Sequence, residues 1–217
     1  MVKPLAEKQY TGRLAPIERW LDAVTEKDLL KGAAIVVLTG VFTAAAAYSA
    51  ASKMELPVAG MTGTIQAISA VSALVMTLLG WILSSLIYHA CALLLGGKGN
   101  RNRMFALSGY ASIPALIQQF LRFVSYSFLG QVPTTSGGSL PEVLLGYFNV
   151  FSVIGLVFVG LAVMINYGLP GRKAAFVALI PTLITLAFGL AMMRLLGGAA
   201  ASSAQGGGLF SGLRHSG

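Results

Sequence analysis

Long uncharged stretches of hydrophobic residues alternate with short polar turns along this chain. A helix needs about 20 consecutive apolar residues to cross the hydrocarbon core of a bilayer. Five stretches meet or approach that requirement, at residues 32–51, 62–95, 104–120 (or as far as 129), 143–167 and 174–196. The pattern therefore predicts an all-α protein, an integral membrane bundle of five transmembrane helices.

The stretch 62–95 contains no Asp, Glu, Lys or Arg and is longer than one span requires. Two spans and a turn do not fit, so we expect one long helix that is tilted or starts outside the bilayer. His89 lies in its later part, where it is either a proton relay or a hydrogen-bonded residue near the interface. Cys91 has no second cysteine to pair with, which favours a packing role.

A short amphipathic helix is predicted over residues 14–24, because apolar residues recur there at helical spacing. These residues are Leu14, Ile17, Leu21 and Val24. Such a helix either lies on the membrane surface or packs on the transmembrane bundle of its own chain. Residues 25–28 have the pattern of a capping box, which predicts that a new helix begins there.

The same pattern divides the chain into three segments. Residues 1–31 are expected to form a cytoplasmic N-terminal segment that carries the amphipathic helix. Residues 32–196 form the transmembrane domain, and residues 197–217 a flexible tail rich in Gly, Ala and Ser.

Composition and charge agree with a membrane protein. Hydrophobic residues make up 56% of the chain and charged residues 10%, whereas soluble domains carry about 25% charged residues. The net charge is +8, but the basic residues lie in turns and form no aromatic and basic face of the kind that binds nucleic acid. We therefore expect anionic membrane lipids, and no nucleic acid, as partners of this charge.

The distribution of Lys and Arg predicts the orientation of the chain, because these residues mark the cytoplasmic side in short loops. Eleven of the 15 lie in the N-terminal segment, in the loop after the second stretch or in the turn after the fourth. The N-terminus is therefore predicted in the cytoplasm and, with five spans, the C-terminus outside. Five of these cations either contact anionic lipid or a partner, or serve only as topology signals: Lys98, Arg101, Arg103, Arg172 and Lys173.

Few polar side chains interrupt the predicted spans. Four of them are expected to hydrogen-bond between helices: Gln118, Gln119, Asn149 and Asn166. Pro114 and Pro181 are expected to kink their helices. Arg122 and Glu142 are a candidate ion pair on the outer side, where Arg122 is either a polar access point or an anchor that reaches the interface.

The chain lacks the side chains that catalysis or proton coupling would require. No acid lies within a predicted span, which disfavours a proton-driven transporter. Neither a His-Glu-x-x-His motif nor a serine elbow occurs, and the glycine-rich residues 96–103 match no phosphate-binding spacing. An unrecognised membrane enzyme is therefore disfavoured, and we expect no catalysis, no metal and no cofactor.

Three motifs follow one another in a distinctive order. The first is Gly96-Gly97-Lys98 leading into residues 105–114, the second is Tyr167-Gly168-Leu169, and the third spans residues 172–181. This order resembles the Yip1 domain family over roughly residues 14–196. The resemblance implies a five-helix bundle with a cytoplasmic N-terminus. It also implies structural roles for Gly96, Gly97, Gly109, Tyr110, Pro114 and Pro181.

The resemblance carries expectations about function as well. Eukaryotic members bind Rab-type GTPases and take part in vesicle traffic, and they usually have a longer cytoplasmic N-terminal region. This chain is more similar to compact prokaryotic members, which implies the plasma membrane of a prokaryote. Some prokaryotic relatives accompany ABC-type export systems.

We therefore expect a non-enzymatic membrane protein that organises membrane or scaffolds a membrane protein complex. Its partners would be membrane lipids and either other membrane proteins or further copies of itself. The alternative is a transport component, either an accessory subunit of an ABC-type exporter or a lipid-moving protein. A continuous polar groove between spans would favour the alternative, and a closed apolar bundle would favour the scaffold.

Overall fold

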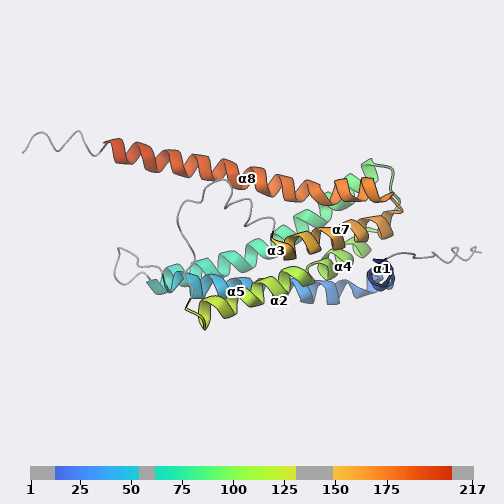
Figure 1. Cartoon of the computed structure of the whole chain (residues 1–217), viewed down its shortest axis with the longest axis horizontal. Coiled ribbons are helices and arrows are strands. Elements are labelled where there is room, and N and C mark those ends of the chain that lie inside the picture. The colour runs from blue at the N-terminus through green and yellow to red at the C-terminus, as the bar shows by residue number, and fades with distance from the viewer. Residues whose placement is uncertain (1–12, 54–61, 131–148, 207–217) are drawn as a thin grey trace, which may run out of the picture.

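The computed structural model describes residues 13–53, 62–130 and 149–206, and these residues form helices and turns but no strands. The helices lie along one long axis (Figure 1). They are α1 (Ala15–Asp22), the short 3-10 helix η1 (Glu26–Asp28), α2 (Leu29–Ala51), α3 (Thr62–Leu94), α4 (Arg101–Ala111), α5 (Ile113–Ser127), α7 (Val150–Tyr167) and α8 (Gly171–Gly206). The prediction of an all-α fold is confirmed for the part of the chain that the structure describes.

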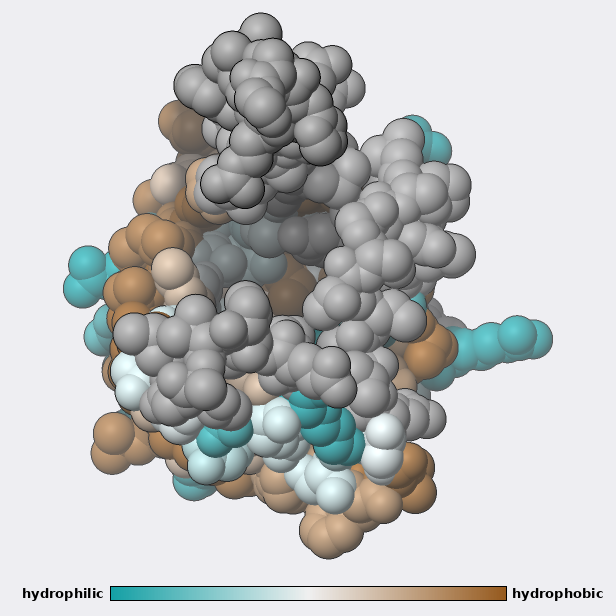
Figure 2. All heavy atoms as spheres, turned by 90° about the vertical axis from the view of Figure 1, so that its left-hand side faces the viewer, coloured by the Kyte–Doolittle hydropathy of each residue, from teal (hydrophilic) through white to brown (hydrophobic). Residues whose placement is uncertain are grey.

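Four helices are long and apolar enough to cross a membrane. They are Glu26–Ala51, Gly63–Leu94, Val150–Tyr167 and Gly171–Phe188. Large apolar side chains on them face outward: Leu30 is 82% exposed and Phe188 is 67% exposed. Hydrophobic residues also lie along the rim of the molecule in the end-on view of Figure 2. An apolar exterior of this extent is unfavourable in water and is expected where lipid covers the surface.

The third predicted span is divided into two helices, which accounts for the difference from the predicted five. α4 has 11 residues and α5 has 15, so neither is long enough alone. Ser112 separates them and belongs to the caps of both. Pro114 stands in the first turn of α5, where its missing N–H costs nothing, while inside a longer helix it would remove a hydrogen bond. A kink was predicted at Pro114, and the structure instead shows two separate helices there.

The remaining boundaries follow the sequence closely, with two differences. α7 begins at Val150 and not at residue 143, because Asn149 has an extended backbone and caps the helix. α3 is a single long helix, as predicted for the uncharged stretch. α8 passes through Pro181 without a break and continues to Gly206, ten residues beyond the predicted end at residue 196. The added segment contains several alanines, the residue with the highest helix propensity, which favours continuation over a coil.

α2 and α4 cross with their backbones almost in contact. A Cβ atom placed on Gly109 would lie 2.5 Å from the carbonyl carbon and oxygen of Gly32. A Cβ atom on Gly32 would lie 2.7 Å from the carbonyl oxygen of Ala106. Small residues allow helices to approach this closely in membranes, where dispersion forces drive association. Gly109 therefore lies where the two helices come closest, and a larger residue would separate them.

α1 packs on the bundle of its own chain, one of the two placements considered for residues 14–24. Leu21 is fully buried among side chains of α4 and α7, including Leu107 and Ala162. Trp20 stacks edge-on against Tyr110, with ring centroids 5.5 Å apart. After α1, the side chain and backbone of Thr25 and Asp28 form the predicted capping box.

Candidate functional site

One end of the molecule brings together α1, the connection from α3 to α4, and the turn from α7 to α8 (Figure 1). We call this region, with residues 95–103 and 166–173 and the C-terminal end of α1, the loop end. Two of the regions predicted to be cytoplasmic, residues 96–103 and 168–173, therefore lie at the same end of the bundle. The contacts within the loop end determine which of its charged groups are available to a partner.

The connection from α3 to α4 is fixed against the end of α7 by backbone contacts. Gly96 has φ +85°, a value that favours glycine, and it ends α3. A Cβ on Gly97 would lie 2.8 Å from Cβ of Tyr167, so only glycine fits there. The Lys98 amide then donates to the carbonyl oxygen of Tyr167 over 3.1 Å. Both motif glycines thus have conformational or packing reasons to be glycine.

Asn166 links the same two segments through its side chain, which is buried. Its Nδ2 donates to the carbonyl oxygen of Asn100 over 2.9 Å, and the Asn100 amide approaches its Oδ1 at 3.4 Å. Asn100 in turn caps α4, because its Oδ1 accepts from the amides of Asn102 and Arg103. The Asn166 side chain therefore joins the end of α7 to the residue that caps α4.

Arg103 holds α1 against the bundle. Its Nε donates to the carbonyl oxygen of Val24 over 2.9 Å. Its Nη2 donates to the carbonyl oxygen of Asp22 over 2.9 Å and to the Asp22 carboxylate over 3.0 Å. These carbonyls lie at and just beyond the C-terminal end of α1, where a cation is favourable. Arg103, predicted as a lipid or partner contact, therefore makes its described contacts within the chain.

Lys173 also makes an internal contact, because its Nζ donates to the carbonyl oxygen of Leu95 over 3.2 Å, just beyond the end of α3. The side chains of Lys98, Arg101 and Arg172 are exposed, and no ion pair of theirs is found among the described residues. The five predicted cations therefore divide into Arg103 and Lys173, whose side chains bond within the chain, and three exposed cations for which no such bond is found among the described residues.

The other predicted polar residues have separate surroundings. Asn149 accepts from the amides of Phe151 and Ser152 and so forms the N-cap of α7, a role that its place in an apolar stretch did not suggest. Gln118 lines a cavity, and Gln119 is half-buried on α5. Arg122 is exposed on α5, while its predicted partner Glu142 lies outside the described residues.

His89 is hydrogen-bonded, as one of its two predicted roles required. Its Nδ1 lies 2.6 Å from the hydroxyl oxygen of Tyr167 across the interface of α3 and α7. Cys91 packs beside the same buried cluster, which includes Tyr88 and Met104. Both residues therefore contribute to packing near the loop end.

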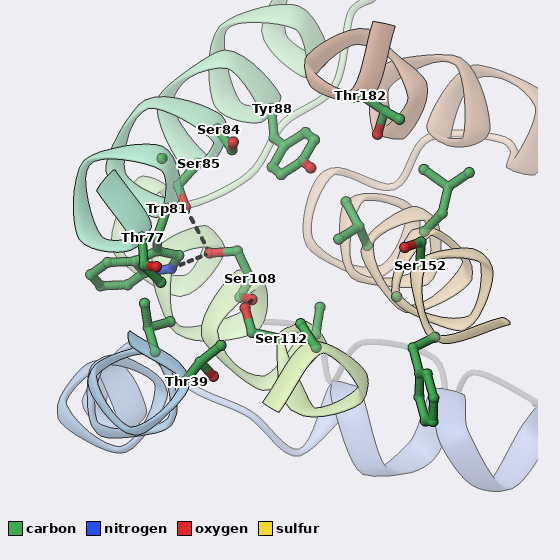
Figure 3. A pocket seen from close by; sticks show the side chains of 18 of the residues that line it. Thr39, Thr77, Trp81, Ser84, Ser85, Tyr88, Ser108, Ser112, Ser152 and Thr182 are labelled. Atoms are coloured by element: carbon green, nitrogen blue, oxygen red, sulfur yellow. Dashed lines mark hydrogen bonds between the residues drawn. The ribbon is translucent and has the colours of Figure 1, made fainter. Parts of the chain in front are cut away.

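A cavity of about 310 Å³ lies between the helices, and we call it the hydroxyl cavity. Every long helix in the described part of the chain contributes to its wall, together with α4 and α5 (Figure 3). The polar residues on its wall are Thr39, Thr77, Ser84, Ser85, Tyr88, Ser108, Ser112, Gln118, Ser152 and Thr182. The described lining residues include no charged side chain and no histidine.

Some of the hydroxyl groups are already paired within the wall. Ser108 receives a hydrogen bond from Trp81 Nε1 over 2.9 Å, and its Oγ lies 2.7 Å from Oγ of Ser85. Ser112 donates back to the Ser108 carbonyl oxygen over 3.0 Å. These contacts join α3 to α4 and fix one wall of the cavity (Figure 3). The opposite wall, formed by α7 and α8, presents Ser152 and Thr182.

The hydroxyl cavity is not predictable from the sequence in the way that amide or charged side chains within a span are. Serine and threonine are common in membrane helices because they can donate to a carbonyl of their own helix. Thr39 and Thr77 do so. Serines and threonines in a predicted span therefore indicate no binding site until the positions of the helices are known. Figure 2, which looks onto the end opposite the loop end, shows the molecule hollowed at its centre.

The fold and the apolar exterior define a multi-pass integral membrane protein. The model of the Yip1 domain matches residues 14–193, and the chain therefore belongs to the Yip1 domain family. No curated protein and no solved structure matches the chain. The match runs from α1 into α8, so the resemblance proposed from three motifs is confirmed.

Proposed function

We propose that this protein is a non-enzymatic membrane scaffold, which holds a partner membrane protein or further copies of itself through its loop end. The single observation behind the proposal is that the loop end is rigidly built yet leaves three cations outward. Hydrogen bonds from Arg103, Asn166 and Lys173 fix its segments against one another. A surface fixed in this way loses little conformational entropy when a partner binds.

The outward cations determine what the loop end can attract. Lys98, Arg101 and Arg172 are exposed. Basic groups beside a membrane gain about 1 kcal/mol each from an anionic leaflet. They also favour an acidic surface on a partner protein, since complementary charge speeds and orients association. The proposed scaffold thus combines lipid attraction with a fixed protein surface.

The proposal includes a topology of five crossings. α4 and α5 together would form a broken third span, since they follow one another with only Ser112 between them. The N-terminus and the loop end would then be cytoplasmic, and the C-terminus would lie outside, in the plasma membrane of a prokaryote. The excess of Lys and Arg at the loop end and in the N-terminal segment supports this orientation.

Crosslinking in native membranes tests the scaffold role. The full chain and a variant with Lys98→Gln, Arg101→Gln and Arg172→Gln would be crosslinked, and their partners identified by mass spectrometry. We expect a membrane protein, or a second copy of the chain, to be crosslinked at the loop end and to be lost from the triple variant. Arg122→Gln is the matched control, because Arg122 is also exposed but lies on α5, away from the loop end.

The scaffold proposal is contradicted if the triple variant recovers the same partners as the wild-type chain. It is also contradicted if partners are crosslinked only to the lipid-facing helices. Recovery of an ATPase subunit with the wild-type chain would instead identify an exporter accessory subunit. Glutamine is used in place of glutamate so that the topology signal is weakened but not reversed.

A transport component is the second candidate function, and the hydroxyl cavity is the observation that favours it. A closed apolar bundle would have offered no place for a polar group within the membrane. The cavity offers many hydroxyl groups on several helices at once. A lipid-moving protein would need such a polar place for a headgroup, since an unpaired polar group is costly in hydrocarbon.

A further inference from the structure

The hydroxyl cavity contains a buried tyrosine whose hydroxyl has no partner in the described structure. Tyr88 is only 8% exposed. Figure 3 shows its hydroxyl turned toward the space between α3, α7 and α8. No hydrogen bond of this group is found among the described residues, although the neighbouring His89 and Tyr167 are paired with each other. Tyr88 therefore offers a donor to whatever fills the cavity.

An unsatisfied buried hydroxyl costs about 1–3 kcal/mol. Ser84, Ser152 and Thr182 also line the cavity, and their hydroxyl groups have no partner among the described side chains. Serine and threonine can turn to a carbonyl of their own helix, but the tyrosine hydroxyl is too far from its backbone to do so. Tyr88 is thus the group in this wall that most requires a partner from outside the chain.

The size and chemistry of the cavity restrict that partner. Its volume of about 310 Å³ is at the lower end of sites for small molecules, which span about 300–1,000 Å³. Since no charged side chain lines the described wall, a phosphate would be buried without a counter-charge, at high cost. Apolar residues such as Val36, Phe151 and Leu156 complete the lining. The partner should therefore be uncharged, able to both donate and accept hydrogen bonds, and attached to an apolar portion.

We propose that the hydroxyl cavity binds the glycerol headgroup of an uncharged membrane lipid of the diacylglycerol class. The Tyr88 hydroxyl donates to an ester carbonyl or to the free hydroxyl of the lipid. Ser152 and Thr182, on the facing helices, complete the polar contacts. The acyl chains remain in the surrounding hydrocarbon. The proposal concerns binding alone, and it holds whether or not the protein also scaffolds a complex.

Photolabelling of the purified full chain tests the proposal. The protein would be reconstituted into phosphatidylcholine vesicles that contain a photoactivatable diacylglycerol or, in parallel, a photoactivatable phosphatidylglycerol. The photoreactive group is placed next to the glycerol. We expect diacylglycerol to label peptides from the cavity wall, in α3, α7 and α8, and unlabelled diacylglycerol to compete. Phosphatidylglycerol should label the cavity peptides at least tenfold less.

Two variants and a matched control connect the label to the cavity. Tyr88→Phe removes one hydroxyl and should lower the labelling about fivefold, the effect expected from one hydrogen bond. Gly155→Leu should abolish it, because a Cβ on Gly155 meets nothing closer than the Ala111 carbonyl oxygen at 3.9 Å and the longer side chain enters the cavity. Tyr48→Phe is the control, since Tyr48 is exposed on α2 outside the cavity.

Several outcomes would overturn the proposal. Absence of competed label from the cavity peptides would show that the space holds water only. Equal labelling by the two lipids would contradict the requirement for an uncharged headgroup. Unchanged labelling in Tyr88→Phe would remove the tyrosine from the site. If Gly155→Leu fails to fold, the peptide map of the wild-type chain and the Tyr88→Phe result still decide the question.

Discussion

Replacing Gly109 with alanine tests whether the near contact of α2 and α4 holds the bundle together. The added Cβ would lie 2.5 Å from the Gly32 carbonyl atoms, against 3.4–4 Å for an ordinary contact. The obstacle is backbone, which cannot rotate away as a side chain can. The two helices must therefore separate by roughly 1 Å, and a gap of that size forfeits about a quarter to a half of each dispersion contact along the crossing.

Two effects of Gly109→Ala oppose each other. Alanine favours the helical state over glycine by about 1 kcal/mol in a helix interior. Overpacking of a close-packed interface costs about 1–3 kcal/mol. Because Gly32 has its own close approach, to the Ala106 carbonyl oxygen at 2.7 Å, the interface cannot slide to relieve the clash. The overpacking cost should therefore lie in the upper part of its range, about 2–3 kcal/mol. After the gain of about 1 kcal/mol in helix propensity, we expect a net destabilisation of about 1–2 kcal/mol.

Thermal unfolding in detergent, followed by circular dichroism, measures this effect. Gly160→Ala is the matched control, because a Cβ on Gly160 of α7 meets nothing within 4 Å. It gains the same helix propensity without a clash, so it should be neutral or slightly stabilising. The reasoning is refuted if Gly109→Ala unfolds at the same temperature as Gly160→Ala or above it.

Three further substitutions test the loop end. Arg103→Ala should free α1, at a cost of about 1.5–3 kcal/mol for charge-assisted hydrogen bonds, and hydrogen exchange of α1 should rise, while Arg101→Ala leaves it unchanged. Asn166→Ala should lower the unfolding temperature by removing the side chain that pairs with the α4 cap, and its effect should exceed that of Arg101→Ala. Gly168→Ala should cost about 1–2 kcal/mol, because Gly168 has φ +65°, while Gly171→Ala in the first turn of α8 should not destabilise; equal unfolding temperatures for these two would contradict the turn geometry.

Apolar patterning predicted the helices well, because helix position in a membrane depends on length and charge along the chain. The uncharged stretch became a single helix, α3, and Pro114 broke the helix that contains it. The start of α7 at Val150 depends instead on the cap formed by Asn149. An asparagine within an apolar stretch can either cap a helix or bond to a neighbouring helix. The sequence does not distinguish the two roles.

The roles of the cations were harder to predict. A basic residue in a loop gives the same sequence pattern whether its side chain contacts lipid or a carbonyl group of the same chain. Arg103 reaches back across 79 residues to Val24, and Lys173 reaches back 78 residues to Leu95. No sequence period connects such distant positions. The hydroxyl cavity escaped prediction for the same reason, since its wall is assembled from short polar side chains on separate helices.

The central claim is that the loop end faces the cytoplasm and that α4 and α5 together cross the membrane. Cysteine accessibility in intact cells tests it most directly. In a Cys91→Ala background, one protein carries Asn102→Cys at the start of α4 and another carries Leu129→Cys just beyond the end of α5. Both positions are exposed. A membrane-impermeant maleimide should label the Leu129→Cys protein in intact cells, and the Asn102→Cys protein only after permeabilisation. Labelling of both proteins from the same side would contradict the crossing by α4 and α5. The reverse pattern would contradict the orientation.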